Sequence, residues 1–300
     1  MENAEGCWHL EQNDTHYPGQ RFQLLQEKIV CERQSNFQSI KVFEHKKFGT
    51  VLTLDGCVQC TTFDEFLYQE MLTFLPLCSV SAPSNVLVIG GGDGGIVREL
   101  LKDSRVERIT LVDIDEEVLN TSKEFIKSMG DSLDDGKVNI LICDASVYVQ
   151  SCSETFDVII IDLVDDGEED ESPMNFDIFG KEFYGKLREL IKDGGVLAQQ
   201  TYSPYSNDKL LAAEVELFRC AADQLCYGFV PVPSFPNGNI GILFGRVVKD
   251  GETTGTQLRT PSYVITADRA KEMNLRCYYD EFHESCCTLP LAFRDWFYNL

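Results

Sequence analysis

A glycine-rich segment that contains one aspartate follows a run of apolar residues. Residues 86–95 read VLVIGGGDGG, in which Gly90, Gly92 and Gly95 fit the spacing G-x-G-x-x-G. Glycines at this spacing let the backbone turn tightly and approach a ligand, as in sites for dinucleotides or S-adenosylmethionine. A fixed negative charge at Asp93 would repel a phosphate at the following helix N-terminus. We therefore expect the ligand to be cationic at this point.

Two more aspartates follow the next two apolar segments. Asp113 ends the segment RITLVD, 23 residues after Gly90, where a carboxylate can accept hydrogen bonds from ribose hydroxyls. Asp144, followed by Ala145, ends KVNILICD and suits an adenine amino group. The alternative for Asp144 is a helix cap before Ser146. With the glycine loop, this pattern predicts a ligand that contains adenosine.

A fourth apolar segment ends in the sequence IIIDLVD, which carries Asp162 and Asp165. In an open α/β sheet the ligand crevice lies outside the carboxyl ends of the strands, so we expect both side chains to share a cavity with Asp93. Repulsion among these carboxylates can raise the pKa of one toward the value that a general base needs. The alternative is that they are turn or cap residues.

The elements that would position these side chains change character along the chain. Residues 1–80 contain β-branched runs broken by turns at Gly49 and Gly56 and then a helical pattern over 64–78, which predicts a small antiparallel β domain with a linking helix. Residues 81–300 alternate apolar strands with amphipathic helices, which predicts a doubly wound α/β fold. The acidic run 165–172 and residues 249–258 are predicted loops.

The composition excludes several classes of protein. The 300 residues carry 26 Lys+Arg and 49 Asp+Glu, a net charge of −23, which disfavours nucleic acid and anionic membranes as partners and favours cations. No apolar run is long enough to span a membrane, so we expect a soluble, cytoplasmic protein. The 12 cysteines are expected to be reduced and mostly buried. We expect no metal site, since Cys57 and Cys60 form the one CxxC pair.

Several segments together resemble the aminopropyltransferases, the polyamine synthases, and the spermidine synthase branch most closely. The segments are Tyr17–Gln20 (YPGQ), Asn36–Gln38 (NFQ), Phe48–Gly56 (FGTVLTLDG), Asp64–Met71 (DEFLYQEM), Gly90–Gly95 (GGGDGG), Asp162–Asp165 (DLVD) and Pro233–Gly241 (PSFPNGNIG). They occur in family order and span roughly residues 17–290. The resemblance implies an N-terminal β domain followed by a Rossmann-like, methyltransferase-type domain.

The resemblance also implies the reaction: transfer of an aminopropyl group from decarboxylated S-adenosylmethionine to putrescine, with release of methylthioadenosine. The donor would be a co-substrate, with no cofactor, and the chain a homodimer. The implied roles follow by position. Gln38, Gly90, Gly92, Asp93, Asp113, Asp144 and Ala145 would bind the donor; Asp162, assisted by Tyr68, would be the base, and would with Asp93 also hold the aminopropyl ammonium; Gln69, Asp165, Tyr202 and Phe235 would bind the acceptor.

The chain departs from the family pattern mainly on the acceptor side. Tyr202 stands where a glutamate is usual, in a stretch that normally reads Gln-Gly-Glu, and Phe235 replaces a tyrosine. In the segment D-S-S-D-P, Leu163 and Val164 replace the serines and Asp166 the proline, while Asp113 replaces a glutamate and Ala145 a glycine. Three alternatives therefore stay open: an enzyme for a longer polyamine such as spermidine, a silent polyamine-binding homologue, and a methyltransferase, whose donor carboxylate Asp93 would disfavour.

Overall fold

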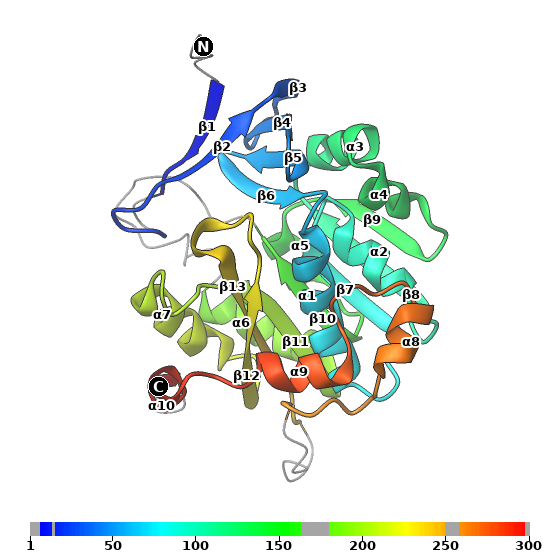
Figure 1. Ribbon diagram of the computed structural model, residues 1–300. Helices are drawn as coiled ribbons and strands as arrows, with labels where there is room; N and C mark the ends of the chain where they lie inside the picture. The colour runs from blue at the N-terminus through cyan, green and yellow to red at the C-terminus, as the bar shows by residue number, and fades with distance from the viewer. Residues whose placement is uncertain (1–6, 14–15, 164–179, 250–257, 298–300) are drawn as a thin grey trace.

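Five apolar segments form the parallel part of a seven-stranded sheet in the computed structural model, which describes residues 7–13, 16–163, 180–249 and 258–297. The strand order is β12-β13-β11-β10-β7-β8-β9 (Figure 1). The parallel strands are β7 (Asn85–Gly90), β8 (Arg108–Asp113), β9 (Val138–Ile142), β10 (Phe156–Asp162) and β11 (Ile191–Thr201). An antiparallel hairpin of β12 (Gln224–Pro231) and β13 (Asn239–Arg246) completes the sheet beside β11.

Alternate residues of each strand are buried on opposite faces of this sheet, as the unbroken apolar runs predict. In β7, Val86 and Val88 belong to one core and Leu87 and Ile89 to the other. The first core also contains residues of α1 (Glu65–Ser79), α2 (Gly95–Leu101), α8 (Ala267–Glu272) and α9 (Asp280–Cys286). The second contains residues of α5 (Ala145–Ser151), α6 (Lys181–Leu190), α7 (Asp208–Phe218) and α10 (Leu291–Phe297). The predicted doubly wound α/β fold is confirmed.

The first part of the chain forms two small antiparallel sheets. One pairs β1 (Cys7–Glu11) with β2 (Phe22–Gln26), and the other has the order β3 (Lys28–Gln34), β4 (Ser39–His45), β5 (Gly49–Leu54) and β6 (Cys57–Thr61). Both lie at one end of the seven-stranded sheet (Figure 1). The domain boundary at residue 80 stays a prediction, and α1, placed before it, packs against α2 and the strands β10–β13.

The helical segment that follows β8 differs from the single helix predicted to end near residue 129. It divides at Ile126 (φ −124°, ψ 56°) into α3 (Glu116–Phe125) and α4 (Lys127–Gly130), followed by the 3₁₀ turn η1 (Asp131–Asp134). Ile126 and Met129 are buried together with Ile40 and Leu52 of the four-stranded sheet. Residues three apart share one face of a straight helix as well, so this shared burial does not by itself require the break.

All twelve cysteines are free thiols, as expected. Five of them are buried, six are partly buried and Cys7 is exposed, so the expectation of mostly buried cysteines is only partly met. No helix among the described residues is long and apolar enough to cross a membrane. The loop predicted over 165–172 lies outside the described residues, as does most of 249–258.

Candidate active site

A cavity of ≈ 530 Å³ lies where the carboxyl ends of the central strands meet the N-terminal sheets. Ten of the residues predicted from the sequence line it: Gln38, Tyr68, Gly90, Gly92, Asp93, Asp113, Asp144, Ala145, Asp162 and Phe235. Two others, Gln69 and Tyr202, are buried and are not part of its described wall. Asp165 lies outside the described residues. The topology thus gathers most of the predicted residues around one space.

The glycine loop and the end of β10 are in direct contact. Gly90 has φ +77°, and a Cβ built there would lie 2.0 Å from the Asp162 carbonyl oxygen, so only glycine fits. That same oxygen accepts a hydrogen bond of 3.0 Å from the Gly91 N–H. This contact fixes Asp93, three residues further along the loop, relative to the Asp162 side chain.

The Asp93 carboxylate is held from both sides. Its Oδ1 accepts from the Gly95 N–H at 2.7 Å, and its Oδ2 accepts from the Gln69 side-chain amide at 2.9 Å. Burial, with the nearby charge of Asp162, raises the pKa of Asp93 to about 7. Gln69, predicted to bind the acceptor, therefore contacts a donor-side carboxylate instead, and its acceptor role stays a prediction.

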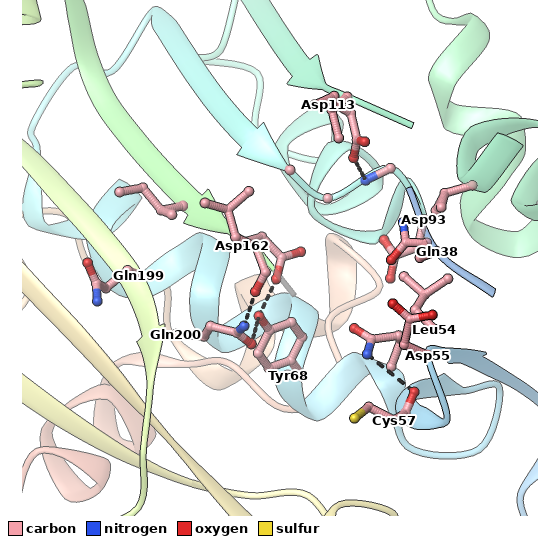
Figure 2. A pocket seen from close by; sticks show the side chains of 18 of the residues that line it. Gln38, Leu54, Asp55, Cys57, Tyr68, Asp93, Asp113, Asp162, Gln199 and Gln200 are labelled. Atoms are coloured by element: carbon pink, nitrogen blue, oxygen red, sulfur yellow. Dashed lines mark hydrogen bonds between the residues drawn. The ribbon is translucent and has the colours of Figure 1, made fainter. Parts of the chain in front are cut away.

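Asp162, Tyr68 and Gln200 form a connected group on one side of β10 and β11 (Figure 2). The Tyr68 hydroxyl donates to Asp162 Oδ1 and lies 3.0 Å from Gln200 Oε1, while the Gln200 amide N–H donates to the Leu163 carbonyl. Burial raises the pKa of Asp162 to about 6, although the Tyr68 hydrogen bond opposes the shift. A carboxylate with this pKa, in contact with a cavity, is suited to take up a proton near neutral pH.

The residues predicted to hold an adenosine lie on the opposite side of the glycine loop. Asp113 Oδ2 accepts from the Gly92 N–H at 3.0 Å (Figure 2), and burial raises the pKa of Asp113. Asp144 is the N-cap of α5, as its alternative reading proposed, because its Oδ1 accepts from the Ser146 N–H at 2.7 Å and also from the Ser146 hydroxyl. Asp144 also lines the cavity, so the two readings are compatible.

Asp115 positions Gln38 and was not singled out from the sequence. The Gln38 amide donates to Asp115 Oδ2 at 2.9 Å, and the Ser35 hydroxyl donates to the same oxygen at 2.7 Å. Asp115 also caps α3 by accepting from the Glu117 N–H. An aspartate directly before the acidic start of this helix was the available signal. Through Asp115, the turn between β3 and β4 is fixed against the end of β8.

Two glutamates in the wall of the cavity were also missed by the sequence analysis. Glu214 of α7 is buried, lines the cavity and accepts a hydrogen bond from the Thr201 hydroxyl. Glu11 of β1 is buried in the same wall and accepts from the Val58 N–H at 2.9 Å. Burial raises the pKa of Glu11 to about 7. No motif marks either residue, since each reaches the cavity only through tertiary packing.

Tyr202 and Phe235, predicted for the acceptor side, are placed differently. The Phe235 ring lines the cavity with its centroid 5.9 Å from that of Tyr68. The Tyr202 ring packs at 5.2 Å against His16, and it is His16 that lines the cavity. Thr201, the neighbour of Tyr202, is the residue that contacts Glu214.

Three buried acidic residues fix α1, which carries Tyr68 and Gln69. Asp64 accepts from the Ser234 N–H and hydroxyl, both at 2.8 Å, and Glu65 pairs with Arg98 and Arg276. Glu70 accepts hydrogen bonds of 2.8–3.1 Å from the backbone N–H groups of residues 276–278. Buried carboxylates are costly unless each is paired in this way. These contacts tie the site to the C-terminal part of the chain.

The arrangement has a definite chemical character. Asp93 of the glycine loop and Asp162 at the end of β10 line one cavity, and Asp113, Glu11 and Glu214 line the same cavity. A cavity of this kind stabilises ligands with several positive charges and disfavours anions. Within the described part of the chain, no cluster of His, Cys, Asp or Glu has the arrangement of a metal site.

Comparisons with known proteins agree with this geometry. Residues 65–250 match the family model "Spermine/spermidine synthase domain", and residues 7–62 match "Spermidine synthase tetramerisation domain". A spermine synthase of Arabidopsis thaliana is 34% identical over 288 residues, covering 94% of this chain and 77% of that protein. A spermidine synthase of Dictyostelium discoideum is 32% identical over 290 residues and covers 97% of both chains.

Solved structures give the same result. A spermidine synthase crystallised with the transition-state analogue AdoDATO aligns with a TM-score of 0.84 at 25% identity, covering 100% of this chain and 97% of that one. Spermine and spermidine synthases match this chain at similar identity, so the relatives do not decide between the two acceptors.

Proposed function

The chain belongs to the spermine/spermidine synthase family of transferases, and we propose that it moves the aminopropyl group of decarboxylated S-adenosylmethionine onto an amine acceptor, with putrescine as the first candidate. The observation that carries the proposal is the pair of carboxylates, Asp93 and Asp162, that face one cavity beside a glycine loop. The donor has a sulfonium and an ammonium and lacks a carboxylate. It therefore matches a wall that would repel the carboxylate of a methyl donor.

The donor is a co-substrate in this proposal, and its binding uses residues on the glycine-loop side. Asp113 accepts hydrogen bonds from the ribose hydroxyls, and Asp144 with Ala145 contacts the adenine. Gln38, fixed by Asp115, closes this part of the cavity. Asp93 holds the aminopropyl ammonium, and an ion pair in a buried setting is stronger than one in water.

The transfer step needs one proton acceptor. The acceptor amine must first be neutral, so a proton passes to the Asp162 carboxylate, to which the Tyr68 hydroxyl already donates. The nitrogen lone pair then attacks the carbon next to sulfur, and the carbon–sulfur bond breaks with its electron pair going to sulfur. The products are the extended polyamine, spermidine when putrescine is the acceptor, and the neutral thioether methylthioadenosine. In-line placement of nitrogen, carbon and sulfur supplies much of the rate.

The acceptor occupies the part of the cavity beyond Asp162 in this proposal. Phe235 lies there beside Tyr68, and Asp165, from the undescribed segment, is a further candidate contact. Tyr202 acts on the acceptor site by packing against the His16 ring rather than by direct contact with the amine. Glu214 and Glu11 offer negative charge for a distal ammonium, which compensates for the absence of the usual glutamate near Tyr202.

These two glutamates also support a second candidate acceptor. A triamine such as spermidine carries one more positive charge than putrescine. The cavity is lined by the donor-side carboxylates, by Asp162 and by the two glutamates, Glu11 and Glu214. A spermine synthase-like reaction is therefore the alternative. A silent polyamine-binding homologue would bind the same cations without turnover.

An amine panel separates these functions. The purified protein is incubated with decarboxylated S-adenosylmethionine and putrescine, spermidine or spermine, and methylthioadenosine is measured. Release with putrescine supports the first candidate, and release only with longer amines supports the second. Binding of donor and amine by calorimetry without release supports the silent homologue. Turnover of undecarboxylated S-adenosylmethionine alone would overturn the proposal.

We further propose that the chain acts as a homodimer in the cytoplasm. The match of residues 7–62 to a tetramerisation domain supports self-association through the N-terminal strands. Sedimentation equilibrium of the purified protein tests the number of copies, and a monomer at micromolar concentration would contradict it.

A further inference from the structure

Gln200 occupies a position that the transfer step described above does not use. It lies at the end of β11, and its amide lies between the Tyr68 hydroxyl and the Leu163 carbonyl (Figure 2). A backbone carbonyl can only accept a hydrogen bond, so the amide nitrogen must face Leu163 and the amide oxygen must face Tyr68. The contacts themselves therefore fix the orientation of this side chain.

The Tyr68 hydroxyl consequently has two acceptors and one proton to donate. Asp162 Oδ1 lies on one side and Gln200 Oε1, at 3.0 Å, on the other. When Asp162 is ionised, its charge makes it the stronger acceptor. When Asp162 is protonated, it becomes a donor itself. If the Tyr68 hydroxyl still pointed at it, the Asp162 carboxyl hydrogen and the Tyr68 hydroxyl hydrogen would face each other and repel. The hydroxyl then needs another acceptor, and Gln200 is in place.

We propose that Gln200 is a positioning residue for the proton transfer, because its amide oxygen accepts the Tyr68 hydroxyl once Asp162 has taken the proton of the attacking amine. Asp162 then donates to the Tyr68 oxygen, and Tyr68 donates to Gln200, so no other proton moves and no two hydrogens face each other. Gln200 thereby stabilises the protonated form of Asp162 and makes it a better base. This inference rests on the proposed function, in which Asp162 is the base.

Burial raises the pKa of Asp162, and the charge of Asp113 from β8 raises it further, whereas the hydrogen bond that Tyr68 donates to the ionised form lowers it. Two other titratable groups among the described residues interact with Asp162. Burial and the charge of Asp162 raise the pKa of Asp93 from the glycine loop, and burial raises the pKa of the Cys60 thiol from β6 well above its usual value, so that this thiol is neutral. Gln200 competes for the hydrogen bond that Tyr68 donates. Loss of the Gln200 oxygen should therefore lower the pKa of Asp162.

The test uses Gln200→Met, which keeps the length of the side chain and removes both hydrogen bonds. The titration of Asp162 is followed in the ligand-free protein by carbon-13 NMR of labelled aspartate and assigned with Asp162→Asn. We expect the midpoint in Gln200→Met to fall by about 0.5–1 on the pH scale, the size of one neutral hydrogen bond. The acid limb of the kcat profile should move in the same direction, with kcat about 3- to 10-fold lower.

A double-mutant cycle separates this role from a structural one. In a Tyr68→Phe background, Gln200→Met should leave the Asp162 midpoint unchanged, because the hydroxyl that connects the two residues is gone. Gln224→Met, at the opposite end of the sheet, is the matched control and should not move the midpoint. If Gln200→Met does not fold, Gln200→Asn, whose amide is too short to bridge both partners, takes its place.

Two results would overturn the inference: an unchanged Asp162 midpoint in Gln200→Met, or an equal shift with and without the Tyr68 hydroxyl. Neither depends on turnover. Failure of the proposed function would appear separately, as absence of methylthioadenosine from the wild-type protein with every amine.

Discussion

The two halves of the cavity are built in different ways. On the donor side, Asp113 and Asp162 are the last residues of parallel strands and Asp93 and Asp144 follow such strands within three residues, and the sheet brings these strand ends together. On the acceptor side, the wall comes from β1, which lies at the start of the described chain, and from β11, α7 and the segment around Phe235, which lie within residues 191–235. The donor side is thus fixed by topology, and the acceptor side by the packing of individual side chains.

This difference indicates in which half of the cavity amino-acid substitutions are tolerated. A change on the donor side alters a loop that Gly90 locks against the Asp162 backbone, so few substitutions fit. In the proposed acceptor half, the carboxylate of Glu214 comes from the helix α7 and not from a strand end. Substitutions in this half are therefore expected to change the preferred amine more readily than the donor.

The largest effect is expected from Asp162→Asn, which removes the base and keeps its shape. Loss of a general base lowers kcat by about 10²–10⁴-fold. Methylthioadenosine release at saturating donor and amine measures it, with circular dichroism melting to show that the fold is kept. Activity within threefold of wild type would place the base elsewhere in the cavity.

Asp93→Asn tests the donor half by charge alone. Loss of a charged hydrogen bond to the donor ammonium should weaken donor binding about 10- to 100-fold. Methylthioadenosine, which has no ammonium, is the matched control ligand, and its affinity should change by less than threefold. Calorimetry with both ligands gives the comparison, and equal losses for the two would show that Asp93 only supports the loop.

Glu214→Gln tests the acceptor half. If this carboxylate holds a distal ammonium, the KM for the amine should rise about 10-fold, while the KM for the donor stays within twofold. Glu216→Gln is a matched control on the same helix, because Glu216 is exposed and pairs with Lys181 on the surface. An amine KM that is the same in both variants would remove Glu214 from the acceptor site.

The remaining prediction concerns the pH dependence of stability rather than binding or turnover. Because burial raises the pKa of Asp93 to about 7 in the folded protein, folding favours its protonated form, and the stability linked to this group falls as pH rises from about 4 through about 7. Asp93→Asn removes that dependence. The ligand-free variant should therefore gain on the order of 4 kcal/mol over wild type at pH 8 and little at pH 4. Chemical denaturation at the two pH values measures the difference, and an equal gain at both would contradict it.

The fold and the donor side could be predicted from the sequence for one physical reason. Apolar runs, a glycine loop and aspartates at or near the ends of four strands are local patterns, and parallel strands bring those ends to one edge of the sheet. The break at Ile126 and the antiparallel β12–β13 hairpin were not predicted, because no local pattern in the sequence marks either of them.

The acceptor side could be predicted only in part. Phe235 lines the cavity, whereas Tyr202 packs behind His16 and Gln69 contacts Asp93. The residue types at the end of a strand do not show which of three successive side chains faces the cavity. Glu11 and Glu214 reach it from a hairpin and a helix that no spacing in the sequence connects.

The contacts of Glu70 have a consequence for synthesis on the ribosome. Tyr278, one of its backbone partners, is 208 residues further along the chain, so about 10–40 s of translation separate them. During that interval the native hydrogen-bond donors to the Glu70 carboxylate have not been synthesised. Burial of this carboxylate in an apolar interior is therefore unfavourable. We therefore expect α1, which carries Tyr68, to reach its native packing only when the chain is nearly complete. A product truncated before residue 276 would lack the hydrogen-bond donors to Glu70.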